Sequence, residues 1–271
     1  NKYGLFNNYE FLIKNSNTEN KNSDYKNEKS LYLSGIYQYN SSFPLIKESN
    51  FYQKIFKPKI SFRIAPNHTK NDRDKDRKID VNNIYSLNRA TDNTSIEGGL
   101  SAAYGFDYSM LNKSSSREVI NLKIANNLRL NKNDDLTNMN QIGEKTSNIF
   151  SQIIYNPNEM LTTKYSTSIK NNLKDANYQN LIAELKVNNF VTTFDYLNEN
   201  NTSNKNSYLS NISKFNIDNS NSFAFSTRKN KTKDLTEYYN FMYQYKNDCL
   251  SASIEYNKDF YSDRELKPSE N

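Results

Sequence analysis

The feature that most constrains this chain is an alternation of apolar and polar residues with a period of two. In residues 96–108 one set of positions holds Ile96, Gly98, Leu100, Ala102, Tyr104, Phe106 and Tyr108, and the other set is small or acidic. Successive side chains of a β-strand point to opposite faces, so the pattern predicts strands with one apolar and one polar face. No convincing 3.6-residue apolar stripe is found. The sequence therefore predicts an all-β, antiparallel fold.

The same pattern predicts about a dozen strands along the chain. They cover residues 3–13, 30–40, 53–66, 95–109, 116–130, 147–156, 159–172, 177–187, 189–199, 206–218, 221–231, 235–246 and 249–261. Most are longer than the usual strand of about five or six residues. Ten residues tilted by about 45° rise roughly 23 Å, close to the ~25 Å apolar band of an outer-membrane barrel. Strand length favours a transmembrane barrel over a soluble sandwich.

The predicted linkers alternate in length. Segments 14–29, 67–94 and 131–146 are long, whereas 110–115 and 157–158 are short. Bacterial outer-membrane barrels alternate short periplasmic turns with longer external loops. We therefore expect an antiparallel transmembrane β-barrel of the outer-membrane type. The chain starts at Asn1 without a signal peptide, so we expect residues 1–271 to be part of a longer protein.

A single Cys and a single His limit the chemistry available to this chain. Zinc sites need several such ligands, and a Ser-His-Asp hydrolase needs a His beside its nucleophile. His68 stands in a polar stretch and is interpreted as a solvated loop residue. We expect no catalysis, no cofactor and no metal site.

Charge is spread rather than concentrated. The formal net charge is +6, and the charged stretch 71–78 is interpreted as solvated loop charge, with attraction of anionic lipid headgroups as the alternative. Aromatic residues beside Lys fall at strand period on the apolar face, where membrane or core packing explains them. We therefore expect no binding of nucleic acid.

Three segments share their order and spacing with one family. They are Pro58–Asn67; Asp80–Arg89 with the later Ile96-Glu97-Gly98-Gly99 and Tyr104-Gly105; and Tyr243–Leu250 with Tyr256–Tyr261 and Leu266–Ser269. In these segments the chain resembles the LPS-assembly protein LptD, also called the organic solvent tolerance protein. The resemblance implies that residues 1–271 are the C-terminal half of the barrel domain, without the periplasmic N-terminal domain and the closing strand. The chain departs from the family at Ala90-Thr91-Asp92-Asn93, where an aromatic residue is usual.

The resemblance also implies a function. It is that of an outer-membrane translocon component that inserts lipopolysaccharide into the outer leaflet of the Gram-negative cell outer membrane. The implied partners are lipopolysaccharide, an LptE-like lipoprotein in the barrel lumen, a periplasmic LptA-like bridge and the outer-membrane bilayer. Two alternatives stay open: a porin or TonB-dependent-receptor-like uptake barrel, and a soluble all-β adhesin or binding protein.

Two motifs are the candidate functional residues. The loop motif is Asn83, Ile84, Tyr85, Leu87, Asn88 and Arg89, and the strand motif is Glu97, Gly98 and Gly99. An apolar run inside a polar loop needs burial. Loop 67–94 either folds back into the barrel mouth and shapes a path for the headgroup, or forms a short edge strand that packs on neighbouring loops. The strand motif is expected to open a strand, with paired glycines marking a bulge or a close backbone approach.

Cys249 is the remaining candidate. We expect it at a strand start after a tight turn, in phase with Ser251 and Ser253 rather than with the lipid-facing Leu250 and Ile254. The resemblance implies a disulfide to a cysteine of the periplasmic domain, and the periplasm is oxidising. The alternative is a free small residue at the rim of the barrel.

Overall fold

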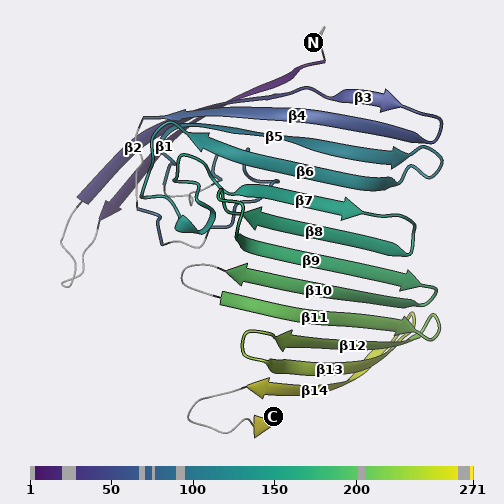
Figure 1. The fold of residues 1–271 in the computed structure, drawn as a ribbon. Helices are drawn as coiled ribbons and strands as arrows, with labels where there is room; N and C mark the ends of the chain where they lie inside the picture. Colours follow the sequence, from purple (N-terminus) through teal and green to yellow (C-terminus); the bar gives the residue numbers. More distant parts are fainter. Residues whose placement is uncertain are drawn as a thin grey trace. The chain divides into compact units, whose positions relative to one another are not determined.

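The computed structural model describes residues 4–19, 29–66, 71–74, 77–89, 95–200, 205–261 and 269–270. In these residues all regular structure is β-strand except for one 3-10 turn, Asn138–Asn140 (Figure 1). The strands are β1 (Phe6–Glu19), β2 (Lys29–Ser42), β3 (Leu45–Glu48), β4 (Tyr52–Ala65), β5 (Gly99–Asn112), β6 (Glu118–Arg129), β7 (Ile149–Tyr155), β8 (Leu161–Ile169), β9 (Ala176–Val187), β10 (Phe190–Asn200), β11 (Lys205–Asn216), β12 (Asn221–Asn230), β13 (Leu235–Lys246), β14 (Ser251–Tyr261) and β15 (Ser269–Glu270).

Every predicted strand is present, and the all-β prediction is confirmed. The short β3 and β15 were not predicted. Two boundaries are wrong. β1 continues to Glu19, beyond its predicted end at residue 13. Glu97 and Gly98 precede β5 instead of opening it, and only Gly99 belongs to that strand. The reason is backbone geometry, because Gly99 has a φ of 102° and the chain becomes extended only after this residue.

The strands follow one another in chain order. Hydrogen-bonded neighbours run from β1 through β2, β4 and β5 to β14 and β15, and β3 pairs with β4 alone. The pairings of β1 with β2, of β4 with β5 and of β10 with β11 are all antiparallel. Among the described strands β1 pairs only with β2, so the sheet has an open edge there. None of the described segments forms a helix of the length and apolarity that a membrane span requires.

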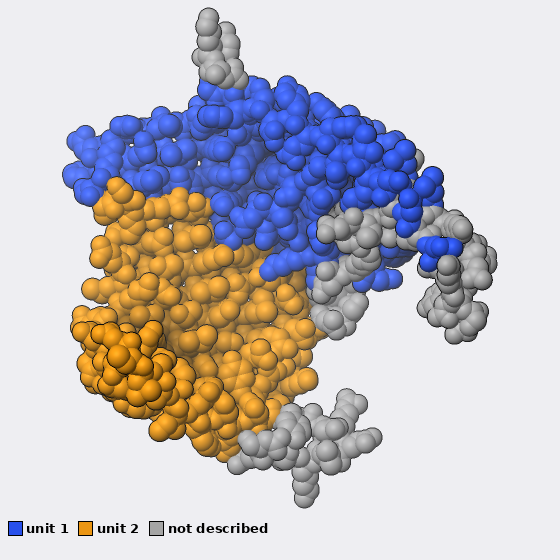
Figure 2. Space-filling model, turned by 180° about the vertical axis from the view of Figure 1, so that it is seen from behind, with its two compact units in different colours: residues 1–114, 122–152, 168–175 blue, residues 115–121, 153–167, 176–271 orange. Residues whose placement is uncertain are grey.

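The chain forms two compact units (Figure 2). Unit 1 comprises residues 1–114, 122–152 and 168–175, and unit 2 comprises residues 115–121, 153–167 and 176–271.

One face of the sheet in unit 1 is apolar and exposed. Alternate positions of four strands present the large side chains Phe11, Ile13, Leu31, Leu33, Phe62, Ile64, Leu100 and Tyr104, with exposed fractions of 43% to 74%. The opposite, polar face carries Gln38, Arg63 and Ser101, which are buried. A soluble sandwich would enclose the apolar side chains in its core. Here they face outward, as in a sheet that borders hydrocarbon.

The core of unit 1 lies on the polar face of its sheet. We call the described segments 71–74, 77–89, 95–98 and 130–148 the loop cap. Buried residues of the loop cap and of the strands form one cluster: Ile79, Val81, Ile84, Ala103, Ala125, Leu136, Ile142 and Phe150. The loop cap therefore closes over the sheet with an apolar interior of its own.

Unit 2 has the same strand chemistry without a cap. Its apolar face carries cross-strand aromatic pairs, including Phe223 with Phe241 at 5.5 Å and Phe225 with Tyr239 at 6.3 Å between ring centroids. Among the described residues of unit 2, Val119 is the only hydrophobic residue that is buried. Among the described residues, no apolar layer comparable to the loop cap therefore covers the polar face of β9–β14.

The linkers confirm the predicted alternation in unit 1 only. There the long connections 66–98 and 130–148 carry the loop cap, and the connection between β5 and β6 is short. In unit 2 the connections 217–220 and 231–234 have the same length, so the predicted alternation is wrong there.

Candidate functional site

Segment 77–89 of the loop cap contains a turn that its own side chains stabilise. The Asp80 carboxylate accepts hydrogen bonds from the backbone N–H groups of Asn82 at 2.7 Å and Asn83 at 3.2 Å. The Asn83 side chain in return accepts one from the N–H of Asp80 at 2.9 Å. The N–H of Ile84 donates to the carbonyl of Asp80. This reciprocal capping fixes a tight turn over 81–85 and directs Ile84 toward the sheet.

Small side chains on the sheet admit the loop cap. Ile84 is 1% exposed and packs in the cluster that includes Ala103 of β5 and Ala125 of β6. Segment 77–89 contains no strand, so the alternative of a short edge strand is wrong for the described loop. The loop packs instead on the polar face of the sheet.

The β6–β7 connection packs against the β4–β5 loop and forms hydrogen bonds with it. The N–H of Asp72 donates to the carbonyl of Asp135 at 2.7 Å, and the Asn140 amide donates to the carbonyl of Arg77 at 2.9 Å. Leu136 and Ile142 complete the shared core. The Asn171 amide, from the β8–β9 turn, donates to the carbonyl of Thr146.

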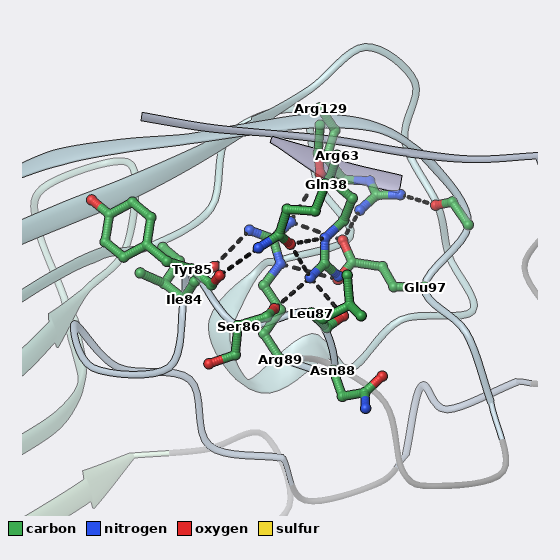
Figure 3. A network of polar contacts seen from close by, with 12 residues as sticks. Gln38, Arg63, Ile84, Tyr85, Ser86, Leu87, Asn88, Arg89, Glu97 and Arg129 are labelled. Carbon is green, nitrogen blue, oxygen red and sulfur yellow. Dashed lines mark hydrogen bonds and ion pairs between the residues drawn. The ribbon is translucent and has the colours of Figure 1, made fainter. Parts of the chain in front are cut away.

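A buried ionic network holds the loop cap to the strands. Figure 3 shows three guanidinium groups that converge on the carboxylate of Glu97. Arg63 of β4 lies 2.7 Å from a carboxylate oxygen, Arg89 of the loop lies 2.9 Å away, and Arg129 of β6 lies 2.5 Å away. All four side chains are at most 2% exposed. Two strands and two points of the loop therefore meet at one carboxylate.

The remaining guanidinium N–H groups bind the backbone of the loop. Arg63 donates to the carbonyl of Leu87 at 2.6 Å and also to that of Ser86, while Arg89 donates to the carbonyl of Ile84 at 3.1 Å. Arg129 donates to the carbonyl of Gly98. Further partners are side chains: Gln38 accepts from Arg63 at 2.8 Å, and Ser101 accepts from Arg89 at 2.9 Å.

The charges of this network do not cancel within it. Burial would raise the pKa of Glu97, but Arg89, Arg63 and Arg129 outweigh it and hold this pKa well below its ordinary value. One carboxylate thus faces three cations, which leaves an excess of positive charge. The backbone carbonyl oxygens that accept hydrogen bonds from the guanidinium groups stabilise this excess. Buried charges are tolerated only when they are paired and hydrogen-bonded. The arrangement is a structural clamp for the loop cap, and no group in it is placed as a nucleophile or base.

Two glycines allow this close approach. Gly99 has a positive φ, and a Cβ there would lie 2.8 Å from an Nη atom of Arg129. At Gly105 a Cβ would lie 2.7 Å from the Tyr85 hydroxyl and would overlap the carbonyl of Ile124. Gly99 therefore makes room for the Arg129 side chain of β6, and Gly105 makes room for the backbone of β6 and for Tyr85 of the loop cap.

Tyr85 connects the network to the sheet beside it. Its carbonyl accepts from the Gln38 amide at 2.6 Å, and the Lys59 ammonium lies 5.1 Å from its ring centroid. Burial and the charge of Asp107 raise the pKa of the Tyr85 hydroxyl. This buried hydroxyl has no hydrogen-bond partner among the described residues.

Most of the predicted motif residues come together. Ile84, Arg89, Glu97 and Gly98 belong to the core or the network, and Leu87 packs on a second buried cluster. That cluster is Ile36, Ala65 and Ile96. Asn83 orders the turn, whereas the carbonyl of Asn88 accepts from Arg77 outside the network.

Sequence reasoning missed Gln38, Arg63, Ser101 and Arg129 as site residues. Arg63 and Arg129 each stand in the polar phase of a strand, next to small residues or amides. A long cationic side chain on a strand face whose other residues are small is the signal that could have identified these two arginines.

Two further interpretations need correction. Asp72 was interpreted as solvated charge, but it is 1% exposed and accepts a hydrogen bond from Ser95 at 2.7 Å. Cys249 is exposed and lies in the turn before β14 rather than in the strand, and its N–H donates to the Asn247 side chain. His68 and the segment 90–93 lie outside the described residues.

The family comparison decides the assignment. The model of the family LptD, LPS transport system D, matches residues 8–228, which is most of the chain and includes the whole loop cap. The chain belongs to the LptD family. Its all-β antiparallel sheet is therefore that of an outer-membrane β-barrel, of which the described strands form an open part.

Other comparisons add little to the LptD assignment. No curated protein matches the chain. Among solved structures, a porin of Rh. blastica with several substitutions is similar at 9% identity over 94% of each chain, with a TM-score of 0.34, which is too distant to support a conclusion. The family match ends before Tyr243–Leu250, so the third resemblance and the role of Cys249 stay predictions.

Proposed function

We propose that this chain is part of an outer-membrane translocon component that inserts lipopolysaccharide into the outer leaflet. Membership of the LptD family supports the lipopolysaccharide cargo. The observation that carries the proposal is the inside-out sheet of unit 1, with exposed apolar side chains on one face and a buried polar network on the other.

The chemistry of the cargo fits this division. Lipopolysaccharide has acyl chains that need apolar surroundings and a sugar headgroup that needs polar ones. A β-barrel offers hydrocarbon-facing residues outside and hydrogen-bonding residues inside. In unit 1 Phe62 and Leu100 are exposed on the apolar face, and Gln38 and Asn40 lie on the other. One sheet thus has a surface for each part of the cargo.

The loop cap is proposed to shape the headgroup path. It covers part of the polar face, and Arg63, Arg89 and Arg129 fix its position through Glu97. A loop held by buried, hydrogen-bonded charges keeps one arrangement, because separating Glu97 from the arginines would leave buried charges without a counter-ion. The loop motif then acts as a fixed wall rather than as a group that reacts with the cargo, in agreement with a protein that transports and does not catalyse.

The partners and the location are those of the family. We propose a Gram-negative outer membrane location, an LptE-like lipoprotein in the lumen and a periplasmic LptA-like bridge. The open polar face of unit 2 leaves a surface for a luminal partner, with Asp195, Ser210 and Arg228 among its residues. Cys249, exposed in the turn 247–250, is proposed to form a disulfide with the periplasmic domain.

Depletion of the full-length protein tests the proposed function. We expect lipopolysaccharide to disappear from the cell surface and to accumulate in the inner membrane, and a plasmid copy of the gene should reverse both effects. Surface lipopolysaccharide is measured by antibody binding to intact cells. An unchanged lipopolysaccharide distribution together with slower uptake of small solutes would show an uptake barrel instead.

A further inference from the structure

A pocket of about 480 Å³ opens in unit 1 beside the tip of the loop cap. Asn82 and Tyr85 of the loop cap form one side of the pocket, and three strands form the rest. The lining residues from β1, β2 and β4 are Phe6, Asn7, Asn8, Asn40, Ser41, Ser42, Lys59 and Ile60. Its volume is within the range of about 300–1,000 Å³ that is typical of small-molecule sites.

The pocket offers neutral hydrogen-bonding groups. The charge of Lys59 is paired with Asp107, whose carboxylate lies 2.5 Å from the ammonium. Asn82 already accepts from Lys123 at 3.1 Å, which leaves its amide N–H groups available. The Ser42 hydroxyl forms no hydrogen bond with the described residues. Asn8 and Asn40 already donate to the Glu10 carboxylate, so the Asn82 amide and the Ser42 hydroxyl are the neutral groups left for a ligand.

Aromatic surface completes the lining. The ring of Phe6 is 63% exposed, and the half-buried ring of Tyr85 lies across the pocket on the loop cap. A sugar ring presents hydroxyl groups around its edge and apolar C–H groups on its faces. Amide and hydroxyl groups pair with the former, and aromatic side chains pack against the latter.

We infer that this pocket binds a sugar of the lipopolysaccharide headgroup through neutral contacts rather than through its phosphate groups. The inference rests on the proposed function and adds the part of the cargo that is recognised. Asn82 and Tyr85 belong to the loop cap, so a sugar in the pocket contacts the loop cap directly. Gln38 links this part of the loop cap to the ionic network, because it hydrogen-bonds both the Tyr85 carbonyl and Arg63.

The test measures binding of the deacylated oligosaccharide of lipopolysaccharide to the purified full-length protein in detergent. Isothermal titration is run with the phosphorylated oligosaccharide, with the same oligosaccharide after dephosphorylation, and with inorganic phosphate alone. We expect equal affinity for both oligosaccharides and no heat from phosphate. Binding of the phosphorylated form alone, or competition by phosphate, would overturn the inference in favour of an anion site.

Pocket variants locate the binding. Ser42→Leu fills the pocket and should weaken binding by about tenfold, which corresponds to about 1.4 kcal/mol. The matched control is Ser210→Leu, on the polar face of β11 in unit 2, which should leave the affinity unchanged. Equal affinities in the two variants would place the sugar elsewhere.

A second variant guards against misfolding of Ser42→Leu. Asn82→Ala removes an exposed side chain of the loop cap and should weaken binding severalfold while the fold is kept. Failure of the inference is distinct from failure of the function: delivery of lipopolysaccharide to the cell surface without oligosaccharide binding at this pocket would refute only the inference.

Discussion

Units 1 and 2 use the same strand pattern and differ in what lies on the polar face. In unit 1 this face has the small residues Ser101, Ala103 and Gly105, and long connections return across it. In unit 2 it has bulkier polar residues such as Asp195 and Arg228, and four-residue connections such as 217–220 are too short to cover it. A period-two pattern therefore makes the sheet, but small residues and a long apolar-containing loop decide whether a second layer forms.

The charges of the two units differ in the same way. Glu97 and its three arginines are enclosed by the loop cap. The Arg228–Glu237 pair of unit 2 is 45% and 21% exposed, and Arg228 lies 5.1 Å from the ring centroid of Tyr208. Solvent screens the interaction between the charges of the exposed pair, whereas the charges of the enclosed network are screened much less. The same ion-pair chemistry should thus stabilise the two units to different extents.

The largest expected effect is that of Glu97→Gln. It keeps the side-chain size but leaves three buried guanidinium groups without their anion, so the free energy of unfolding should fall by about 3–5 kcal/mol. The measurement is urea unfolding of the full-length protein in detergent, with hydrogen exchange to localise the loss to the loop cap. Glu237→Gln is the control in unit 2 and should cost at most about 1 kcal/mol. Equal losses would remove the contrast between the units.

Gly99→Ala should have the next largest effect. The positive φ and the nearby Arg129 Nη atom both disfavour a Cβ at this position, at a cost of about 1–3 kcal/mol. Gly35→Ala is the matched control, because a Cβ there would meet atoms only at 3.6 Å and 3.9 Å and no positive φ is present. Thermal unfolding of both variants decides the point; a loss at Gly35 as large as that at Gly99 would argue against the strain.

The strands could be predicted because period two is a local signal. Alternation at Leu100, Ala102 and Tyr104 needs no knowledge of the neighbours of the strand, and β5 was placed from it. The start of β5 was misplaced since the alternation runs on through Glu97 and Gly98, whereas the positive φ of Gly99 interrupts the extended chain. The sign of a backbone φ angle is not encoded in an apolar-polar pattern.

The network could be predicted only in part. Arg89 and Glu97 are close in sequence and were both singled out through the family motif. Arg63 and Arg129 lie on β4 and β6, and their meeting depends on the register of both strands with β5. Register follows from long-range pairing, which a single sequence does not reveal.

Acid should weaken the clamp through Glu97. Its pKa in the folded protein lies below the unfolded value of about 4.3, so its contribution to stability is complete above that pH and is lost as the pH falls toward the folded value. We expect the unfolding free energy to decline by up to about 1.4 kcal/mol per pH unit below pH 4.3 because of this group. Unfolding midpoints between pH 3 and pH 7 measure the decline, and Glu97→Gln should reduce it. An identical acid slope in that variant would assign the loss to other carboxyl groups.

The smallest expected effects come from two tyrosine hydroxyls, and they should differ in sign. The hydroxyl of Tyr85 is buried without a partner among the described residues, so Tyr85→Phe removes an uncompensated polar group and should change the stability of unit 1 by about 0 to +1 kcal/mol. The hydroxyl of Tyr243 in unit 2 donates to the Asn221 side chain at 2.5 Å, so Tyr243→Phe should cost about 0.5–1.5 kcal/mol. Urea unfolding of the two variants compares them directly. A clear loss of stability in Tyr85→Phe would mean that this hydroxyl has a partner, such as a bound water beside Gly105, and that the loop cap is hydrated where it meets β5.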